Sequence, residues 1–265
     1  CTKLSDATLL NLCTKINAKC GGINHTLASR ANARSDQPSF QSPPHSLGWM
    51  FQQPCMVVGI DVSHPEPGST HASTAAVVAS MDRYCVQYAA HLSAQTSRQE
   101  MVSELANAMT QLLDQFRDNN EGHYPKHIIV YRDGVSEGQF DAVLEHELIA
   151  IQHGVEQCGL MLGPEPDAVK LAIVVCQKRH KTRLVFEESP GSFVNLSPGV
   201  VVDGSSPEDN HDITSAQYLE FYLNSHVSIQ GTAKPCRYTL IYDSLGFKLP
   251  ELQTLTFWLC HLYSR

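Results

Sequence analysis

The sequence predicts an α/β protein built on a mixed β-sheet with helices packed against it. Three observations support this prediction. Short apolar runs rich in Val and Ile, typical of buried strands, alternate along the chain with segments of helical periodicity. A tight turn separates two of the first three strand-like runs, which indicates an antiparallel hairpin. The later strands are separated by helices, and this spacing is typical of parallel pairing.

The composition excludes several classes of protein. The 265 residues are 42% hydrophobic and 17% charged, which suits a large domain with a sizeable core and argues against disorder. No run of about 18 apolar residues and no signal peptide is found, so we expect a soluble protein without membrane association. The net charge of −8 argues against a general nucleic-acid binder, although it does not describe a local cleft.

Nine cysteines are irregularly spaced and form no C-x-x-C pair, so a zinc site is not expected. Those in apolar runs, Cys55, Cys85, Cys176 and Cys260, are interpreted as small core residues. Unpaired cysteines fit a reducing, intracellular compartment, and we expect a cytoplasmic location, with an additional nuclear location also considered. The chain begins at Cys1 and ends in an apolar segment, and we expect it to be part of a longer protein.

The first half of the chain opens with a helix and continues with strands. Leucines at helical spacing predict a helix over residues 4–19, which the Gly21-Gly22 pair ends. Residues 26–54 are rich in Ser, Pro, Gln and Asn and are predicted to be a linker with an extended end. Strands are expected over residues 55–62, 73–81 and 83–92, with the tight turn at Met81 and Asp82.

The second half alternates helices and strands. An amphipathic helix is expected from Ser97 to about Phe116, because apolar residues recur along one side of it. The further elements are strands at 127–134, 171–178 and 237–243, and helices at 137–158 and 249–265. A hairpin followed by helix-linked strands is the arrangement of an RNase H-like mixed sheet, since a doubly wound sheet places a helix between every pair of strands.

Asp61 and Asp133 each stand at the end of an apolar strand, in MVVGID and IIVYRD. If the strands are parallel neighbours, both carboxylates lie at one sheet edge, where α/β folds build sites. Carboxylates ~4 Å apart repel by roughly 4 kcal/mol at an effective dielectric of about 20, so the pair requires a proton or a cation. Such ligands favour Mg²⁺ or Mn²⁺, and two ions can act on a phosphodiester. The alternative is that each aspartate only caps a turn.

Two further candidates lie near these strands. Glu100 belongs to SRQE, where Ser97 and Glu100 match a capping box at a helix start, and the local pattern favours capping over chemistry. His64, in DVSHP, is interpreted as a turn residue ahead of Pro65, with a role as a base near Asp61 as the alternative.

Positive charge is concentrated in QKRHKTR at residues 177–183, directly after a predicted strand. Phosphate contacts and a solvated loop are equally compatible with an isolated run of this kind. Lys15 and Lys19 are four residues apart and therefore share one face of the first predicted helix, where lysines are usually surface residues.

Six segments of this chain, taken together, resemble the PIWI domain of the eukaryotic Argonaute family, in its Argonaute rather than its Piwi branch. They are GIDVSHP, SRQE, YRDGVSEGQF, QKRHKTR, NSHVSIQGTAKP and LCHLYSR, in the family's order and approximate spacing. A further segment, LCTKINAKCGGIN, resembles the end of the preceding MID domain. The resemblance implies that residues 1–25 end a MID domain, that 26–54 form a linker, and that 55–265 form an RNase H-like PIWI domain truncated at its C-terminus.

The resemblance implies a guide-directed endoribonuclease, the slicer of RNA silencing. Asp61 and Asp133 match its metal-binding aspartates, Glu100 matches the glutamate that completes the catalytic site, and two Mg²⁺ or Mn²⁺ ions are the implied cofactors. Lys234 stands where many relatives have Arg. The positions that match guide-RNA contacts are Lys15 and Lys19 for the 5′ phosphate, and Arg179, Lys181, Arg183, His226, Lys234, Tyr263 and Arg265 for the backbone.

The resemblance also limits what this chain can do. The family's fourth catalytic residue, a His or Asp, lies beyond Arg265, so we expect the chain by itself to be inactive. The implied partners are a small guide RNA, a complementary target RNA and glycine–tryptophan repeat scaffold proteins. The alternative function is a platform that holds guide RNA and silences by recruiting partner proteins.

Overall fold

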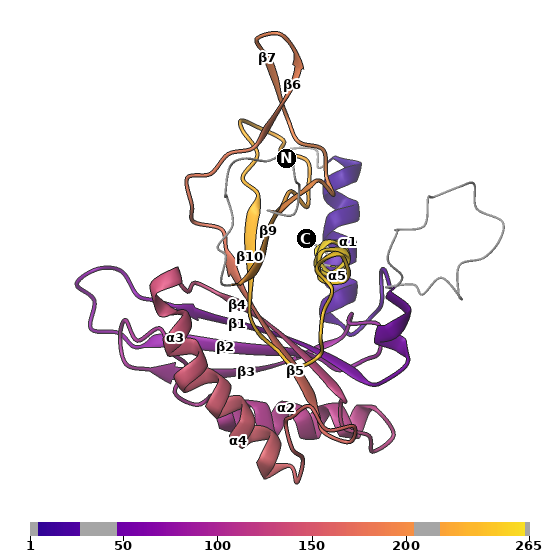
Figure 1. Ribbon diagram of the computed structural model, residues 1–265, viewed down its shortest axis with the longest axis vertical. Coiled ribbons are helices and arrows are strands. Elements are labelled where there is room, and N and C mark those ends of the chain that lie inside the picture. Colours follow the sequence, from indigo (N-terminus) through magenta and orange to yellow (C-terminus); the bar gives the residue numbers. More distant parts are fainter. Residues whose placement is uncertain (1–4, 27–46, 204–217, 263–265) are drawn as a thin grey trace, which may run out of the picture.

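Figure 1 shows the computed structural model, which describes residues 5–26, 47–203 and 218–262. Its centre is an eight-stranded sheet in the order β3-β2-β1-β4-β5-β10-β9-β8. The strands are β1 (Cys55–Ser63), β2 (Ser73–Ser80), β3 (Tyr88–Gln95), β4 (His127–Asp133), β5 (Lys170–Gln177), β8 (Val201–Asp203), β9 (Leu219–Leu223) and β10 (Cys236–Asp243).

The sheet is mixed, as the sequence predicts. β4 pairs in parallel with β1 on one side and with β5 on the other. The remaining pairs are antiparallel, including the β1–β2 and β2–β3 pairs that begin the sheet. This arrangement confirms the predicted RNase H-like α/β fold and brings the carboxyl ends of β1, β4 and β5 to one edge.

Helices cover both faces of the sheet, which explains why its central strands are apolar almost throughout. In β1, Val58 and Ile60 pack in the core beneath α2 (Leu105–Asn119) and α4 (Ile149–Gln157). The alternate residue Val57 faces the other core, under α5 (Leu249–Leu259) and the 3₁₀ turn η2 (Leu47–Phe51). This alternation follows from the two-residue period of a strand.

The chain between β4 and α4 is one helical run of mixed geometry rather than the single helix expected over 137–158. It comprises η3 (Glu137–Gln139), α3 (Phe140–Ala142), the π-helical segment η4 (Val143–Leu148) and α4. A π-helical turn within an α-helix is uncommon and is frequent at functional sites. Here it carries a buried glutamate, Glu147, that takes part in the site described below.

Two predicted boundaries are wrong at their N-terminal ends. The third strand was expected from residue 83, but β3 begins at Tyr88. The Asp82 carboxylate accepts hydrogen bonds from the backbone N–H groups of Tyr84, Val86 and Gln87 at 2.8–3.1 Å, so residues 82–87 form a side-chain-held loop. The helix expected from Ser97 begins only at residue 105.

Several smaller elements differ from expectation. The linker end predicted to be extended contains η2, and the last helix ends at Leu259. Strands β8 and β9 and the separate hairpin of β6 (Val185–Ser189) and β7 (Ser192–Asn195) were not predicted. The hairpin projects from one end of the molecule, and its side chains are exposed, so burial imposes no apolar alternation on them (Figure 1).

The first helix, α1 (Asp6–Lys19), confirms the helix predicted over 4–19 and begins after Ser5, whose side chain accepts a hydrogen bond from Thr8 N. Its described side chains are mostly exposed, and Gln87 Nε2 donates to the Gly21 carbonyl just beyond it at 2.6 Å. The predicted domain boundaries at residues 25 and 54 stay predictions.

Cys55 and Cys85 are buried in the core as predicted, whereas Cys176 and Cys260 are partly exposed; all eight described cysteines are free thiols. Burial raises the pKa of the Cys85 thiol to about 12, so that thiol stays protonated at neutral pH.

Within the described residues, no helix combines the length and the apolar character that crossing a bilayer requires.

Gly154 of α4 packs tightly against α2, which generates a test of the packing. A Cβ at position 154 would lie 2.7 Å from Met109 Cβ and 2.8 Å from the Ala106 carbonyl oxygen. We expect Gly154→Ala to lower the free energy of unfolding by about 1–3 kcal/mol, because overpacking outweighs the higher helix propensity of Ala. Urea unfolding measures this change. Gly138→Ala is the matched control, since a Cβ there meets no atom within 4 Å; equal effects of the two substitutions would contradict the packing.

Candidate active site

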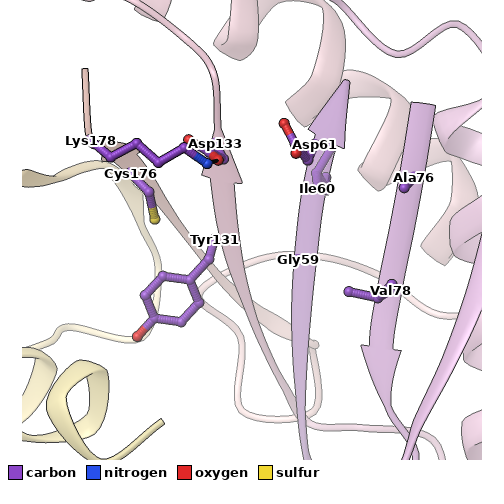
Figure 2. Close-up of a pocket in the computed structure, with 9 residues that line it drawn as sticks. All are labelled: Gly59, Ile60, Asp61, Ala76, Val78, Tyr131, Asp133, Cys176 and Lys178. Atoms are coloured by element: carbon purple, nitrogen blue, oxygen red, sulfur yellow. Dashed lines mark hydrogen bonds and ion pairs between the residues drawn. The ribbon is translucent and has the colours of Figure 1, made fainter. Parts of the chain in front are cut away.

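Asp61 and Asp133 lie level with each other at the carboxyl ends of β1 and β4. The strands are parallel neighbours, and Ile60 pairs with Arg132 immediately before the two aspartates. Figure 2 shows both carboxylates at the same ends of adjacent strands, lining one cavity of about 370 Å³ with Lys178. The sequence prediction that these two side chains meet at one sheet edge is therefore confirmed.

A larger cleft of about 720 Å³ opens over this edge. The ends of β1, β4 and β5 form its floor, and the loop before α2 and the turn after β4 form its walls. Its ionisable or polar lining side chains include Asp61, His64, Glu100, Asp133, Lys178, Arg179 and Arg237. The cleft thus joins the predicted carboxylates to the start of the basic segment.

Glu100 lies in this cleft and does not cap a helix. The helix α2 begins five residues later, at Leu105, and the Glu100 carboxylate instead accepts from Arg132 Nη1 at 3.1 Å and contacts His64 Nε2 at 2.8 Å. The local preference for a capping role is therefore wrong. The reason is that residues 97–104 are not helical, so no helix starts at Ser97 for Glu100 to cap.

Sequence reasoning preferred a turn role for His64 and kept a site role as the alternative. The structure favours the alternative, because the His64 ring bridges two elements, with Nδ1 2.8 Å from Ser73 Oγ on β2 and Nε2 at Glu100. The signal available in the sequence was the position of His64 three residues after Asp61, at the same sheet edge.

The residues that sequence reasoning missed are Arg132 and Glu147. Arg132 is a buried residue that holds Glu100 and the end of β4 in place at the cleft through hydrogen bonds. Its side chain is fully buried and forms a two-point ion pair with Glu147, Nε to Oε2 at 2.8 Å and Nη2 to Oε1 at 3.0 Å. Arg132 Nη2 also donates to the Glu100 carbonyl at 2.7 Å, and Nη1 donates to the Asp133 carbonyl. Burial acts to lower the pKa of Arg132, but the hydrogen bonds and charges of Glu147 and Glu100 outweigh it and raise that pKa.

Glu147 completes this buried network. Its Oε1 accepts a further hydrogen bond from Val102 N at 3.1 Å, in the segment that links Glu100 to α2. The single carboxylate thereby fixes Arg132 on β4, the π-helical segment η4 and the loop before α2. A buried pair of this kind is stable only when its remaining donors and acceptors are also satisfied, and here they are shared with the cleft wall.

Gly134 allows the carboxylates to approach one another. Its φ is +90°, a left-handed conformation that favours glycine, and its N–H donates to Asp133 Oδ1 at 2.8 Å. A Cβ at this position would lie 3.0 Å from Glu100 Oε1 and 3.8 Å from Asp61 Oδ1. The absence of a side chain at Gly134 therefore leaves room next to the Glu100 and Asp61 carboxylates.

Lys178, directly after β5, forms an ion pair with Asp133 Oδ2. The hydrogen bond with Asp133, and further the charge of Asp61, raise the pKa of Lys178.

The side chains of Asp61 and Asp133 offer carboxylate oxygens as metal ligands. Mg²⁺ and Mn²⁺ prefer such ligands, so the two side chains fit a divalent ion chemically. In the described part of the chain, however, no three His, Cys, Asp or Glu side chains are gathered closely enough to hold an ion.

The basic segment after β5 is exposed, and Arg179 at its start lines the cleft. Arg183 Nη1 donates to the carbonyls of His180 and Thr182 at 3.0 and 2.7 Å, which keeps the segment turned on itself. His180 Nε2 contacts the Pro235 carbonyl at 2.8 Å. This contact brings the basic segment beside the loop that carries the exposed Lys234.

The remaining predicted positions are more scattered. His226 is exposed and packs against the ring of His261 with centroids 4.5 Å apart. Lys15 and Lys19 are exposed on α1, and neither lines the cleft. Tyr263 and Arg265 lie outside the described residues. The structure therefore brings together Asp61, Glu100 and Asp133 with part of the basic segment, and leaves the roles of the other positions as predictions.

Comparison with known proteins adds an independent line of evidence. The family model described as the Piwi domain matches residues 2–265. The C-terminal lobe of a budding yeast Argonaute is similar, with a TM-score of 0.73 and 27% identity over 92% of this chain and 46% of that chain. Kluyveromyces polysporus Argonaute with a guide RNA gives a TM-score of 0.71 and 26% identity over 93% of this chain and 26% of that one.

Drosophila Piwi is 23% identical, with a TM-score of 0.70 over 99% of this chain and 31% of that chain, and it supports the fold. The chain spans less than half the length of each of these three structures. Their similarity therefore concerns one part of a larger molecule.

The buried network predicts a specific stability pattern. Arg132→Met leaves Glu147 buried without its partner, so we expect the free energy of unfolding to fall by about 3–5 kcal/mol. Adding Glu147→Met should restore most of the loss, because two apolar side chains of similar volume replace the ion pair. Chemical denaturation of the two single variants and the double variant measures this coupling. Additive losses in the double variant would show that the two side chains do not depend on each other.

Proposed function

The chain belongs to the Piwi domain family, and from this premise we propose that it is the PIWI region of an Argonaute that binds small guide RNA and contributes to a metal-dependent site for cutting paired target RNA. The observation that carries the proposal is the level placement of Asp61 and Asp133 on parallel strands in one cleft, with Glu100 across Gly134. A cleft over the carboxyl ends of strands is where α/β folds build sites.

Asp61 and Asp133 would hold the divalent ions, Mg²⁺ or Mn²⁺, with Glu100 as the third carboxylate of the site. When bound, such ions supply polarisation of a phosphate oxygen and a lowered pKa for a water molecule. Arg132 and His64 orient the Glu100 carboxylate at the cleft wall. From there Glu100 can accept a hydrogen bond from a water molecule and direct it at the phosphate.

The proposed RNA contacts follow the positive charge. Arg179, Lys181 and Arg183 are exposed beside the cleft and can bind guide phosphates, with His226 and Lys234 extending the surface. Lys15 and Lys19 on α1 are proposed to bind the guide 5′ phosphate, and Tyr263 and Arg265 to add backbone contacts. Sequence specificity would come from pairing between guide and target, because RNA backbone contacts carry no sequence information.

A second candidate is a guide-RNA platform that silences without cutting, by recruiting partners such as glycine–tryptophan repeat scaffold proteins. Two observations favour it. The Glu100 carboxylate is engaged by Arg132 and His64, and an ammonium group engages Asp133. For either function we propose a cytoplasmic location, with an additional nuclear location also considered, since the cysteine pattern fits a reducing, intracellular compartment.

Cleavage by the guide-loaded full-length protein tests the first candidate against the second. With Mg²⁺ and a perfectly paired target, we expect a single cut opposite the middle of the guide. Asp133→Ala should reduce the cleavage rate by at least about 10²-fold, because charge stabilisation at the phosphate is lost. Guide binding should be unchanged. Asp118→Ala, which removes an exposed aspartate paired with Arg117, is the control. A wild-type protein that gives no such product supports the platform instead.

The basic segment generates a second prediction, on binding alone. Lys181→Ala and Arg183→Ala should each weaken guide-RNA binding and reduce the salt dependence of log K by about 0.7, the value for one phosphate contact on a single strand. Filter binding over a range of KCl concentrations measures both quantities. Lys126→Ala is the control, because that lysine is at the opposite end of β4 and donates to the Asp167 carbonyl. An unchanged salt slope in both test variants would place the guide elsewhere.

A further inference from the structure

We propose that Lys178 is a displaceable counter-ion of the carboxylate pair, which competes with the divalent ion for Asp133 and so sets the metal affinity of the cleft. The inference rests on the proposed function in one respect, the use of Asp61 and Asp133 as ligands. It adds a residue that controls when those ligands are free.

The strand register puts Lys178 at this position. β5 pairs in parallel with β4, and Cys176 lies level with Asp133. Two residues further on, Lys178 returns to the same side of the strand, since side chains alternate with a period of two. Cys176 and Lys178 accordingly line the same cavity as both aspartates, and Figure 2 shows the lysine side chain reaching to Asp133.

Lys178 is the cation committed to this pair. Among the ion pairs of the described residues, Lys178 makes the one that reaches either aspartate side chain. The other strong cation nearby, Arg132, is occupied by Glu147 and Glu100 and gives Asp133 only a hydrogen bond to its backbone carbonyl. Lys178 therefore offsets the repulsion between the Asp61 and Asp133 carboxylates, to which Arg132 makes no side-chain ion pair.

The ammonium is also easily displaced. The Lys178 side chain is 60% exposed, against 23% for Asp133, and exposed ion pairs contribute little to stability. A lysine ammonium and a divalent ion at one carboxylate repel each other, because both are positively charged. Binding of the ion therefore competes with the ion pair of Lys178, and four flexible methylene groups let the ammonium turn toward solvent.

Metal binding without RNA tests this proposal in the intact protein. Mn²⁺ is titrated and the free ion is followed by electron paramagnetic resonance. Lys178→Met should lower the Mn²⁺ dissociation constant about two- to fivefold, the range expected for removing one exposed competing charge. Lys178→Arg, which keeps the charge, should bind Mn²⁺ as weakly as the wild type. Lys170→Met is the matched control, since that lysine begins the same strand at its far end and should leave the constant unchanged.

The aspartates separate failure of this proposal from failure of the proposed function. Asp61→Asn with Asp133→Asn should abolish the tight Mn²⁺ site. If that double variant loses the site but Lys178→Met binds Mn²⁺ no better than wild type, the counter-ion role is overturned and the metal site stands. If the double variant binds Mn²⁺ as well as wild type, both the carboxylate site and the counter-ion role are overturned.

Discussion

The fully buried guanidinium of Arg132 is the constraint on which the candidate site depends. Such a charge in the core between the sheet and its helices is stable only with a carboxylate partner, and Glu147 meets that need. Arg132 stands immediately before Asp133, so satisfying it also holds the end of β4. Its remaining donors reach Glu100, which explains how a residue that lies 32 positions earlier is kept at the same sheet edge.

The local geometry around this network departs from regular structure where the network requires it. Glu147 stands in a π-helical segment, and the segment before α2 stays irregular while Glu100 and Val102 bond to the buried pair. Gly134 adopts a left-handed backbone where a side chain would separate the carboxylates. Unusual backbone at a site of this kind is stabilised by the surrounding core rather than by its own sequence. The protein is acidic as a whole, but the carboxylates of the site have cations beside them: Arg132 pairs with Glu147, and Lys178 pairs with Asp133.

Much of the fold and the centre of the site could be predicted from the sequence. Apolar runs located the five strands β1, β2, β4, β5 and β10, because a strand buried on both faces is apolar throughout. The same runs placed Asp61 and Asp133 at strand ends. The start of β3 could not be predicted, because Asp82 holds its own loop through three backbone hydrogen bonds. Nor could the hairpin of β6 and β7, whose exposed side chains follow no apolar pattern.

The sequence by itself determined the order of β1, β2, β4, β5 and β10, the two strand-end aspartates and the family, since these depend on periodicity and on motifs that are local in the chain. Tertiary structure alone decided the contacts of Glu100. Its capping motif is complete in the sequence, yet residues 97–104 are not helical, and the Glu100 carboxylate contacts Arg132 and His64 instead. The pairing of Lys178 with Asp133 was decided in the same way, by the register of β4 and β5, which no local pattern records.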